Sequence, residues 1–463
     1  MDEKKRMLKN TGLIALGNAG VKVMAFLLLP LYTSIVSTEE YGQYDFIVAV
    51  SVFLLPIITC TMYEAMFRFI IDGKNDKDFK KIITNSFLII SLGVVLFGAV
   101  TLVIYAIFKI SIVILIWIYV VASALYTYGN YLLRGLGKIK EYALITSVKN
   151  ILQLVINIIV IAFFRWGMYG LLFSMCVTEI LAFIVTFVYS KLSKYIKVEE
   201  ISVKEIKDML NYSLPLVPNA LCAQIINVSD RFVISMFMGS SANGIYSVSY
   251  KFPNIIETVY HYFYTAWSES ASRIIAKGKE EAKKYYQTLY FEVSNFIFAV
   301  VIMMISGMAI MFRLFVRGDY TEGFNYIPIL MFAMYFDCIS KFYAGVFTAL
   351  KETKLIAKTT VIAAACNIII NVVLINKIGL YAAAISTLVS EILMTVLRSR
   401  KIKEAIGIRE DNRANLVKLV VAIVVCGLYH YNNWIRIIAG IIIATAFSIV
   451  NNRKIIVAII KKK

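Results

Sequence analysis

Five Lys and Arg residues lie inside long apolar stretches of the sequence, where a charge is costly to bury. They are Lys22, Lys149, Arg231, Lys251 and Lys341. A charge at the centre of a membrane span costs about 2.5–3.5 kcal/mol on insertion scales, so it usually faces a partner or a watery cavity. Desolvated Lys and Arg are natural ligands for phosphate groups. Such residues are therefore candidates for binding an anionic ligand.

Polar residues accompany two of these cations at helical spacing. Lys22 shares a helix face with Asn18 and lies roughly 16 Å into its apolar stretch, too deep to reach the membrane surface easily. Gln224, Asn227 and Arg231 form a similar stripe, and an offset of 202 residues pairs Lys22 with Gln224. We predict that both stripes line one cavity and bind the anion. The alternative is that each cation pairs with a buried carboxylate and only joins helices.

A third polar stripe contains residues of both charge types. Asn254, Glu257 and His261 share one helix face, and Lys251 lies at its edge. We predict that Lys251 and Asn254 contribute to the anion site. Glu257 and His261 are candidates for binding a proton or a cation, and a polar cavity wall is the alternative interpretation.

The remaining charges in apolar stretches favour structural roles. Asp337 and Lys341 are four residues apart, a spacing that predicts a self-neutralising pair on one helix. Lys149 is predicted to extend its side chain to the nearby membrane surface. Glu179 and Glu391 occupy matching places in an internal repeat, which predicts a shared role at helix contacts.

The composition requires a membrane as the main solvent. Hydrophobic residues make up 60% of the 463 residues and charged residues 17%, and the mean hydropathy is +0.76. An ordinary soluble domain has roughly 45–50% apolar and about 25% charged residues. The net charge of +19 is spread in short packets between apolar runs, which excludes a basic face for nucleic acid.

The apolar runs predict an all-α polytopic membrane protein with about 14 transmembrane helices. The predicted spans are 11–36, 44–66, 82–108, 110–133, 142–164, 168–190, 212–238, 244–270, 288–316, 324–350, 355–376, 379–397, 415–431 and 433–450. With a cytoplasmic N-terminus, 37 Lys and Arg fall on the cytoplasmic side and six outside. Positive residues remain on the cytoplasmic side during insertion, so both termini are predicted to lie there.

The sequence contains a duplication of six spans. Residues 135–161 parallel residues 349–375 at an offset of 214, and Glu179 pairs with Glu391 at an offset of 212. Six is an even number, so the copies share one orientation, as in transporters with parallel repeats.

This repeat predicts the domain organisation. The parts are an N-terminal lobe (1–190), a cytoplasmic linker (191–211), a C-terminal lobe (212–397), and two extra helices with a basic tail (398–463).

The chain resembles the polysaccharide-transport branch of the MOP exporter superfamily, which includes Wzx-like oligosaccharide flippases. The resemblance rests on the two six-helix lobes, the EYG-x-Y turn at Glu40–Tyr44 and the RGLGKIKEYA segment at 134–143. It implies a fold like MATE exporters and lipid II flippases. It also implies movement of an undecaprenyl-diphosphate-linked oligosaccharide across the cytoplasmic membrane by alternating access. The two extra helices resemble those thought to hold the polyprenyl tail in lipid II flippases.

Two other functions stay open. A cation-coupled MATE-type multidrug exporter should carry acidic cavity residues, whereas the deepest charges here are mainly basic. A polytopic polysaccharide polymerase or glycosyltransferase usually has a large external loop, and the longest one predicted here is about seven residues, 317–323. We expect no cofactor, since the six cysteines are widely spaced and only two histidines are present. The expected partners are the lipid-linked glycan, membrane lipids, H⁺ or Na⁺, and polymerase or glycosyltransferase enzymes.

Overall fold

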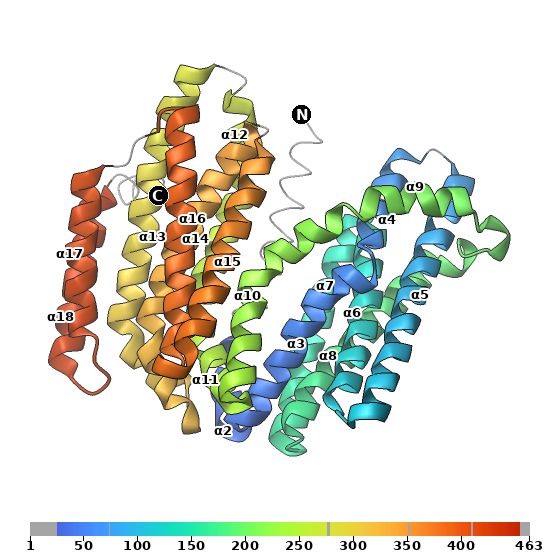
Figure 1. The fold of residues 1–463 in the computed structure, drawn as a ribbon, viewed down its shortest axis with the longest axis horizontal. Coiled ribbons are helices and arrows are strands. Elements are labelled where there is room, and N and C mark those ends of the chain that lie inside the picture. Colours follow the sequence, from blue (N-terminus) through green and yellow to red (C-terminus); the bar gives the residue numbers. More distant parts are fainter. Residues whose placement is uncertain (1–25, 74, 276–277, 351, 409–410, 454–463) are drawn as a thin grey trace. The chain divides into compact units, whose positions relative to one another are not determined.

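The computed structural model describes residues 26–73, 75–275, 278–350, 352–408 and 411–453 (Figure 1). Over these residues the chain is helical and contains no strand, which confirms the predicted all-α class. The chain divides into two compact units, Met1–Ser235 and Met236–Lys463. The division at the 191–211 linker, taken from the repeat, stays a prediction.

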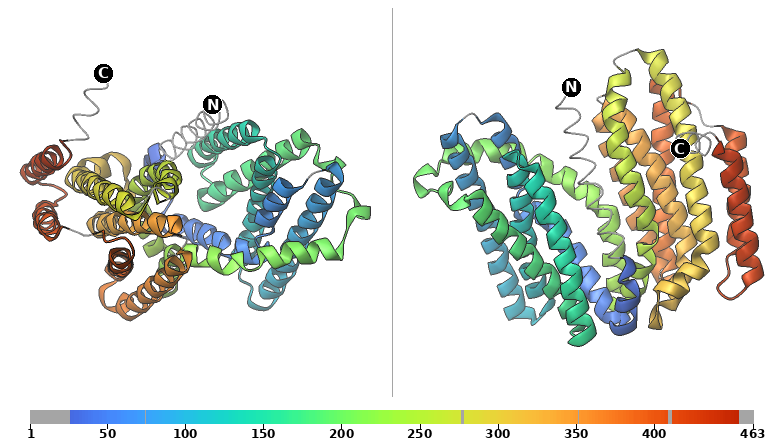
Figure 2. Two further views of the ribbon diagram at one scale, coloured as in Figure 1. Left: turned by 90° about the horizontal axis from the view of Figure 1, so that it is seen from above. Right: turned by 180° about the vertical axis from the view of Figure 1, so that it is seen from behind.

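The first unit is a bundle in which α3, α5, α6 and α8 run roughly side by side (Figures 1 and 2). Its helix α3 begins at a capping box, where Ser37 and Glu40 satisfy each other's backbone N–H groups. Its elements in chain order are α2 (Leu29–Ile35), α3 (Thr38–Ile58), α4 (Met62–Asp72), α5 (Asp76–Phe108), α6 (Ile112–Gly135), α7 (Ile139–Ile158), η1 (Ile159–Phe163), α8 (Gly167–Ser190), η2 (Leu192–Lys194), η3 (Val198–Glu200), α9 (Val203–Ser213) and α10 (Leu216–Met238), which ends past the unit boundary.

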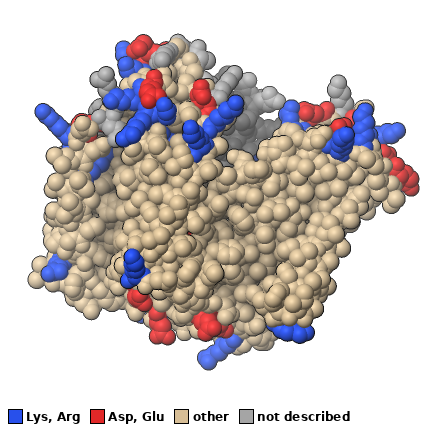
Figure 3. All heavy atoms as spheres, viewed as in Figure 1, with Lys and Arg blue, Asp and Glu red and all other residues tan. Residues whose placement is uncertain are grey.

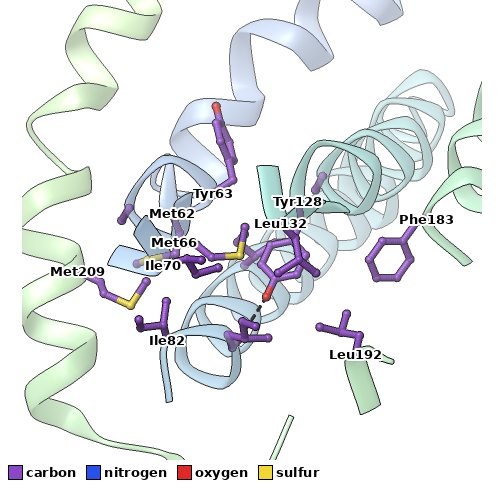
Figure 4. Packing of buried hydrophobic residues seen from close by; sticks show 14 residues of the cluster. Met62, Tyr63, Met66, Ile70, Ile82, Tyr128, Leu132, Phe183, Leu192 and Met209 are labelled. Atoms are coloured by element: carbon purple, nitrogen blue, oxygen red, sulfur yellow. Dashed lines mark hydrogen bonds between the residues drawn. The ribbon is translucent and has the colours of Figure 1, made fainter. Parts of the chain in front are cut away.

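The core of this unit includes part of the predicted linker. Met66, Ile82 and Tyr128 are buried where α4, α5 and α6 meet (Figure 4). Leu192 and Met209, from either end of the linker, are fully buried in the same cluster. Burying large apolar side chains stabilises such a contact by roughly 1.5–3 kcal/mol each. The linker is therefore a packed part of the first unit.

Two polar side chains of α5 fix the linker backbone. The Asn85 amide donates to the Glu200 carbonyl at 2.9 Å and accepts from the Ser202 N–H at 2.9 Å. The Thr84 hydroxyl donates to the Tyr195 carbonyl at 2.9 Å. These bonds satisfy backbone groups that helices do not pair, so the linker follows a defined path over the end of α5.

In the second unit α14 lies at the centre of the helix packing, against α12, α13, α15 and α16. Helices α17 and α18 form a pair beside α13 (Figure 2). The elements are α11 (Ser240–Lys251), α12 (Pro253–Ile275), α13 (Lys279–Phe315), η4 (Gly318–Tyr326), α14 (Ile327–Ala349), α15 (Thr353–Ile378), α16 (Tyr381–Ala405), α17 (Asn412–Leu428) and α18 (Trp434–Asn451).

Ten described helices are long and apolar enough to cross a membrane, and eleven if the bent pair Val203–Cys222 and Gln224–Met238 is one span. Most of the predicted first span, 11–36, lies outside the described residues, and α17 has only 17 residues. The chain is a multi-pass membrane protein, and the number fourteen stays a prediction.

Most exposed charged side chains lie near the ends of the helices in each unit. In the view of Figure 3 a broad band between the ends carries almost none. In the first unit Lys77, Lys80 and Arg134 lie at the end where α5 begins and α6 ends. Lys109 and Arg165 lie at the opposite end. Which of these ends faces the cytoplasm stays a prediction of the charge rule.

Candidate functional site

Arg231 on α10 forms an ion pair with Asp45 on α3. Arg231 Nε lies 3.2 Å from Asp45 Oδ2, and the two side chains are 12% and 16% exposed. The adjacent residues also contact each other, since the rings of Phe46 and Phe232 lie 5.2 Å apart in an edge-on arrangement. The pairing with a carboxylate, which the sequence left open as an alternative, is thus the observed state of Arg231.

A second ion pair lies deeper in the first unit. Lys149 Nζ on α7 is 3.7 Å from Glu179 Oε1 on α8, and both side chains are 7% exposed. Glu179 also accepts a hydrogen bond of 2.8 Å from Ser123, and Lys149 donates one of 3.0 Å to Gln153. The prediction that Lys149 reaches the membrane surface is wrong, because its ammonium group faces this carboxylate. The group joins α6, α7 and α8.

In the second unit one lysine contacts two carboxylates. Lys341 Nζ lies 2.7 Å from Asp337 Oδ2 on the same helix and 2.7 Å from Glu257 Oε1 on α12. The predicted Asp337–Lys341 pair is confirmed, and Glu257 is an additional partner. His261 lies one turn beyond Glu257 and is exposed.

Two further ionisable groups are buried beside this lysine. Arg398 is 3% exposed and donates to the Ser340 carbonyl at 2.9 Å and to the Thr359 hydroxyl at 3.0 Å. Glu391 is 6% exposed, and its Oε2 atom has no hydrogen-bond partner among the described residues. The charges of Asp337, Lys341, Arg398 and Glu257 all act on the Glu391 carboxyl.

We call these five residues the α14–α16 charge cluster: Glu257, Asp337, Lys341, Glu391 and Arg398. It holds three acids and two bases, so full ionisation would leave an excess negative charge, which water partly screens because the Lys341 and Glu257 side chains are 39% and 40% exposed. Such a charge is costly unless a cation or a proton balances it.

The other predicted site residues lie in both units. Gln224 is half-buried on α10, seven residues before Arg231, while Lys251 ends α11 and Asn254 begins α12, both half-buried. Asn18 and Lys22 lie outside the described residues, as does the side chain of Asn227. The roles predicted for all of these residues stay predictions.

Most of the first unit and the beginning of the second match a known protein family. Residues 7–268, more than half of the chain, match the model of a family described as polysaccharide biosynthesis protein. The chain belongs to this family. The predicted resemblance to the polysaccharide-transport branch of the MOP superfamily is confirmed. Among proteins with curated descriptions, a sequence comparison finds no match.

Solved structures of MOP transporters share the fold of this polysaccharide biosynthesis protein. Lipid II flippase MurJ in an inward closed conformation has a TM-score of 0.71 at 17% identity, covering 96% of this chain and 99% of its own. An inward-facing multidrug resistance MATE family transporter has a TM-score of 0.66 at 13% identity, covering 83% and 95%. An outward-facing one has 0.57 at 14%, covering 87% and 96%.

The second unit of this polysaccharide biosynthesis protein also has an apolar cleft of about 500 Å³. Aromatic and aliphatic residues of α13, α14, α16 and α17 line it, among them Phe298, Phe336 and Leu419. Its polar members include Thr395, Asn415 and Lys418, and Lys418, 7% exposed, donates to Ser294 at 2.6 Å. The cleft fits an apolar chain and has one cation at its wall.

Sequence reasoning missed three charged members of these groups. Asp45 lies near the start of a predicted span and was not considered as the partner of Arg231. Arg398 and Lys418 were counted among the cytoplasmic cations, although both are buried. One signal was available for Arg398, because it lies seven residues after Glu391 and thus on the same face of α16.

No group of three or more His, Cys, Asp or Glu side chains suited to a metal ion occurs in the described part of the chain.

Proposed function

We propose that this protein is a flippase that moves an undecaprenyl-diphosphate-linked oligosaccharide from the cytoplasmic to the outer leaflet of the cell membrane. The observation that carries the proposal is the match of residues 7–268 to the polysaccharide biosynthesis family. The fold shared with a lipid II flippase over 96% of the chain supports it. The charge rule predicts that both termini lie in the cytoplasm.

The anionic headgroup of this substrate needs cations at membrane depth. Arg231 supplies one, and Lys22 and Lys251 are the further candidates. A diphosphate accepts paired hydrogen bonds from a guanidinium group, which favours Arg231 as the principal contact. The sequence predicts Asn18, Gln224, Asn227 and Asn254 as further, neutral donors for the headgroup. In this scheme alternating access exposes these groups first to the cytoplasm and then outside.

The lipid part of the substrate needs an apolar path. The cleft beside α17 has about 500 Å³ of space and apolar walls. It fits part of a polyprenyl chain, while Lys418 at its wall suits a phosphate. This assigns to α17 and α18 the role that the resemblance implies for the two extra helices.

Transport against a gradient needs a source of free energy, and a coupled ion would supply it. The α14–α16 charge cluster has the excess acid that H⁺ or Na⁺ would neutralise. Glu257 belongs to the cluster, and His261 lies one turn from it. Glu391, whose Oε2 atom has no hydrogen-bond partner within the described part of the chain, is the group we favour for binding the ion.

A cation-coupled MATE-type exporter is the second candidate function. It is favoured by the same cluster, because three acids in one place suit an organic cation as well as a coupling ion. The family match favours the flippase over this alternative. A polymerase or glycosyltransferase has no specific structural observation in its favour.

A leaflet assay tests the proposed function directly. Depleting the protein should cause undecaprenyl-linked glycan to accumulate facing the cytoplasm, which is measured by its accessibility to an impermeant enzyme in oriented vesicles. Arg231→Ala should abolish surface polysaccharide, and because it leaves the Asp45 carboxylate without this counterion, polysaccharide is measured per amount of protein in the membrane. The matched control is Lys377→Ala, which removes an exposed cation near the end of α15. Unchanged glycan distribution on depletion would contradict the flippase function.

A further inference from the structure

The Asp45–Arg231 pair connects the two sequence repeats inside the first unit. Asp45 lies on α3, in the first repeat, and Arg231 lies on α10, in the second. The residues are 186 positions apart, so only tertiary packing brings them together. This ion pair therefore ties one helix of each repeat to the other.

The pair lies at matching depth in both helices. Asp45 follows the beginning of α3 at Thr38 by seven residues, and Arg231 precedes the end of α10 at Met238 by seven. Seven residues correspond to about 10 Å of helix. Both helix ends are predicted to be external, so the pair would lie about 10 Å along the helices from these ends, close to the external start of the predicted span 44–66.

Apolar rings partly cover the Asp45–Arg231 ion pair, but its charged groups remain accessible. Phe46 directly follows Asp45 in the sequence, and Phe232 directly follows Arg231. The contact between the two rings places apolar groups beside the charges. The exposed fractions of 12% and 16% leave both side chains within reach of a small polar group. In such a setting an ion pair is strong, and a bare cation is costly.

We propose that Asp45 is a positioning residue that holds Arg231 ready for the anionic headgroup and is exchanged for its phosphate on binding. The proposal rests on the proposed function and deepens it. Exchange of one anion for another keeps the Arg231 cation paired throughout, and the released Asp45 carboxylate, 16% exposed, must then turn toward water or take up a proton. A diphosphate carries more charge than one carboxylate and binds a guanidinium group at two oxygens, so it can displace Asp45.

This exchange would select for charge and change the helix contact together. A neutral lipid cannot displace the carboxylate, so Arg231 stays tied to α3. An anionic headgroup on Arg231 breaks the tie between α3 and α10. Asp45 thereby sets both the specificity for phosphate and the threshold for separating the two helices.

Binding of inorganic pyrophosphate to the purified full-length protein in detergent tests the exchange by calorimetry. Asp45→Asn removes the competing charge with little change in shape, so it should tighten binding on the order of tenfold. Arg231→Gln should abolish binding. Asp72→Asn is the matched control, because Asp72 pairs with Arg68 at the same 3.2 Å but on the exposed surface. Its affinity for pyrophosphate should equal that of the wild type.

Affinity of Asp45→Asn that is unchanged or weaker would overturn the proposal, as would absence of pyrophosphate binding by both wild type and variant. If the Asp45→Asn protein does not accumulate, Asp45→Ser also removes the charge and should likewise bind pyrophosphate more tightly. Asp45→Glu should keep the wild-type affinity for pyrophosphate because the competing charge is retained. The leaflet assay separates this from the proposed function. If depletion changes the glycan distribution as expected but the Asp45 variants bind pyrophosphate with wild-type affinity, the flippase function stands and the proposed exchange of Asp45 for phosphate is contradicted.

Discussion

Two buried glutamates in matching positions of the repeats have different surroundings. In the first half Glu179 is held by Lys149 at 3.7 Å and by Ser123 at 2.8 Å. The offset of 214 places Asp337 at the position of Ser123 and Ala363 at that of Lys149. Glu391, the counterpart of Glu179, thus has an acid where the first half has a hydroxyl, and a methyl group where it has an ammonium group.

The difference separates a structural role from a functional one. The first half balances its buried carboxylate with a single cation and a hydrogen bond from Ser123, which fixes three helices. The second half balances three carboxylates with two cations and leaves Glu391 Oε2 without a hydrogen bond among the described residues. Helices related by the duplication thus form a neutral ion pair that joins helices in one lobe and a site with more acidic than basic groups in the other.

The largest effect is expected from removing the cation of the first half. Lys149→Ala leaves the Glu179 carboxylate buried without its counterion, so the free energy of unfolding should fall by about 3–5 kcal/mol. Thermal unfolding in detergent and abundance in the membrane measure the loss. Lys149→Met/Glu179→Gln, which removes both charges, should recover most of it. Equal stability of Lys149→Ala and wild type would show that the pair does not join the helices.

A smaller loss of stability is expected from the corresponding change in the second half. Lys341→Ala leaves Asp337 and Glu257 without their closest cation. The Lys341 side chain is 39% exposed, so water screens the freed carboxylates and the cost should be about 1–2 kcal/mol. Surface polysaccharide should nevertheless be lost, because the cluster then holds three acids and one base. Normal export by a stable Lys341→Ala protein would contradict a role of the cluster in transport.

The features predicted correctly from the sequence depend on local spacing. The helical class follows from runs of about 20 apolar residues, and the Asp337–Lys341 pair follows from four-residue spacing on one helix. Asp45 and Arg231, by contrast, pair across 186 residues, and no local pattern specifies which helices pack together. The position of Lys149 was mistaken for a related reason, since distance from the span end does not show which way a side chain turns.

The internal repeat also contains information about the neighbours of Glu179 and Glu391. Its alignment pairs Glu179 with Glu391, from which a shared structural role was inferred. Extending the same alignment to the neighbours would have placed Asp337 opposite Ser123 and Ala363 opposite Lys149, and so predicted the excess acid. The repeat alignment alone does not indicate Arg398 as part of this group, because the counterpart of Arg398 at the 212 offset is the uncharged Thr186.

The smallest effect on stability, and the sharpest functional contrast, is expected from neutralising each glutamate. Glu391→Gln should change the free energy of unfolding by no more than about 1 kcal/mol, because the carboxylate it removes is incompletely hydrogen-bonded. If Glu391 carries the coupled proton, delivery of glycan to the outer leaflet should be low in this variant and insensitive to a protonophore. The charged groups that act on it are Asp337 and Lys341 of α14, Glu257 of α12 and Arg398 of α16.

Glu179→Gln is the matched control, since it makes the same chemical change at the matching position of the other repeat. It should lower stability by leaving Lys149 buried without a counterion, while the glycan that is still exported remains sensitive to the protonophore. The two variants therefore separate fold from coupling at repeat-related positions. Protonophore-sensitive export by Glu391→Gln at the wild-type level would place the coupling elsewhere, and Glu257 and His261 would be the next groups to change.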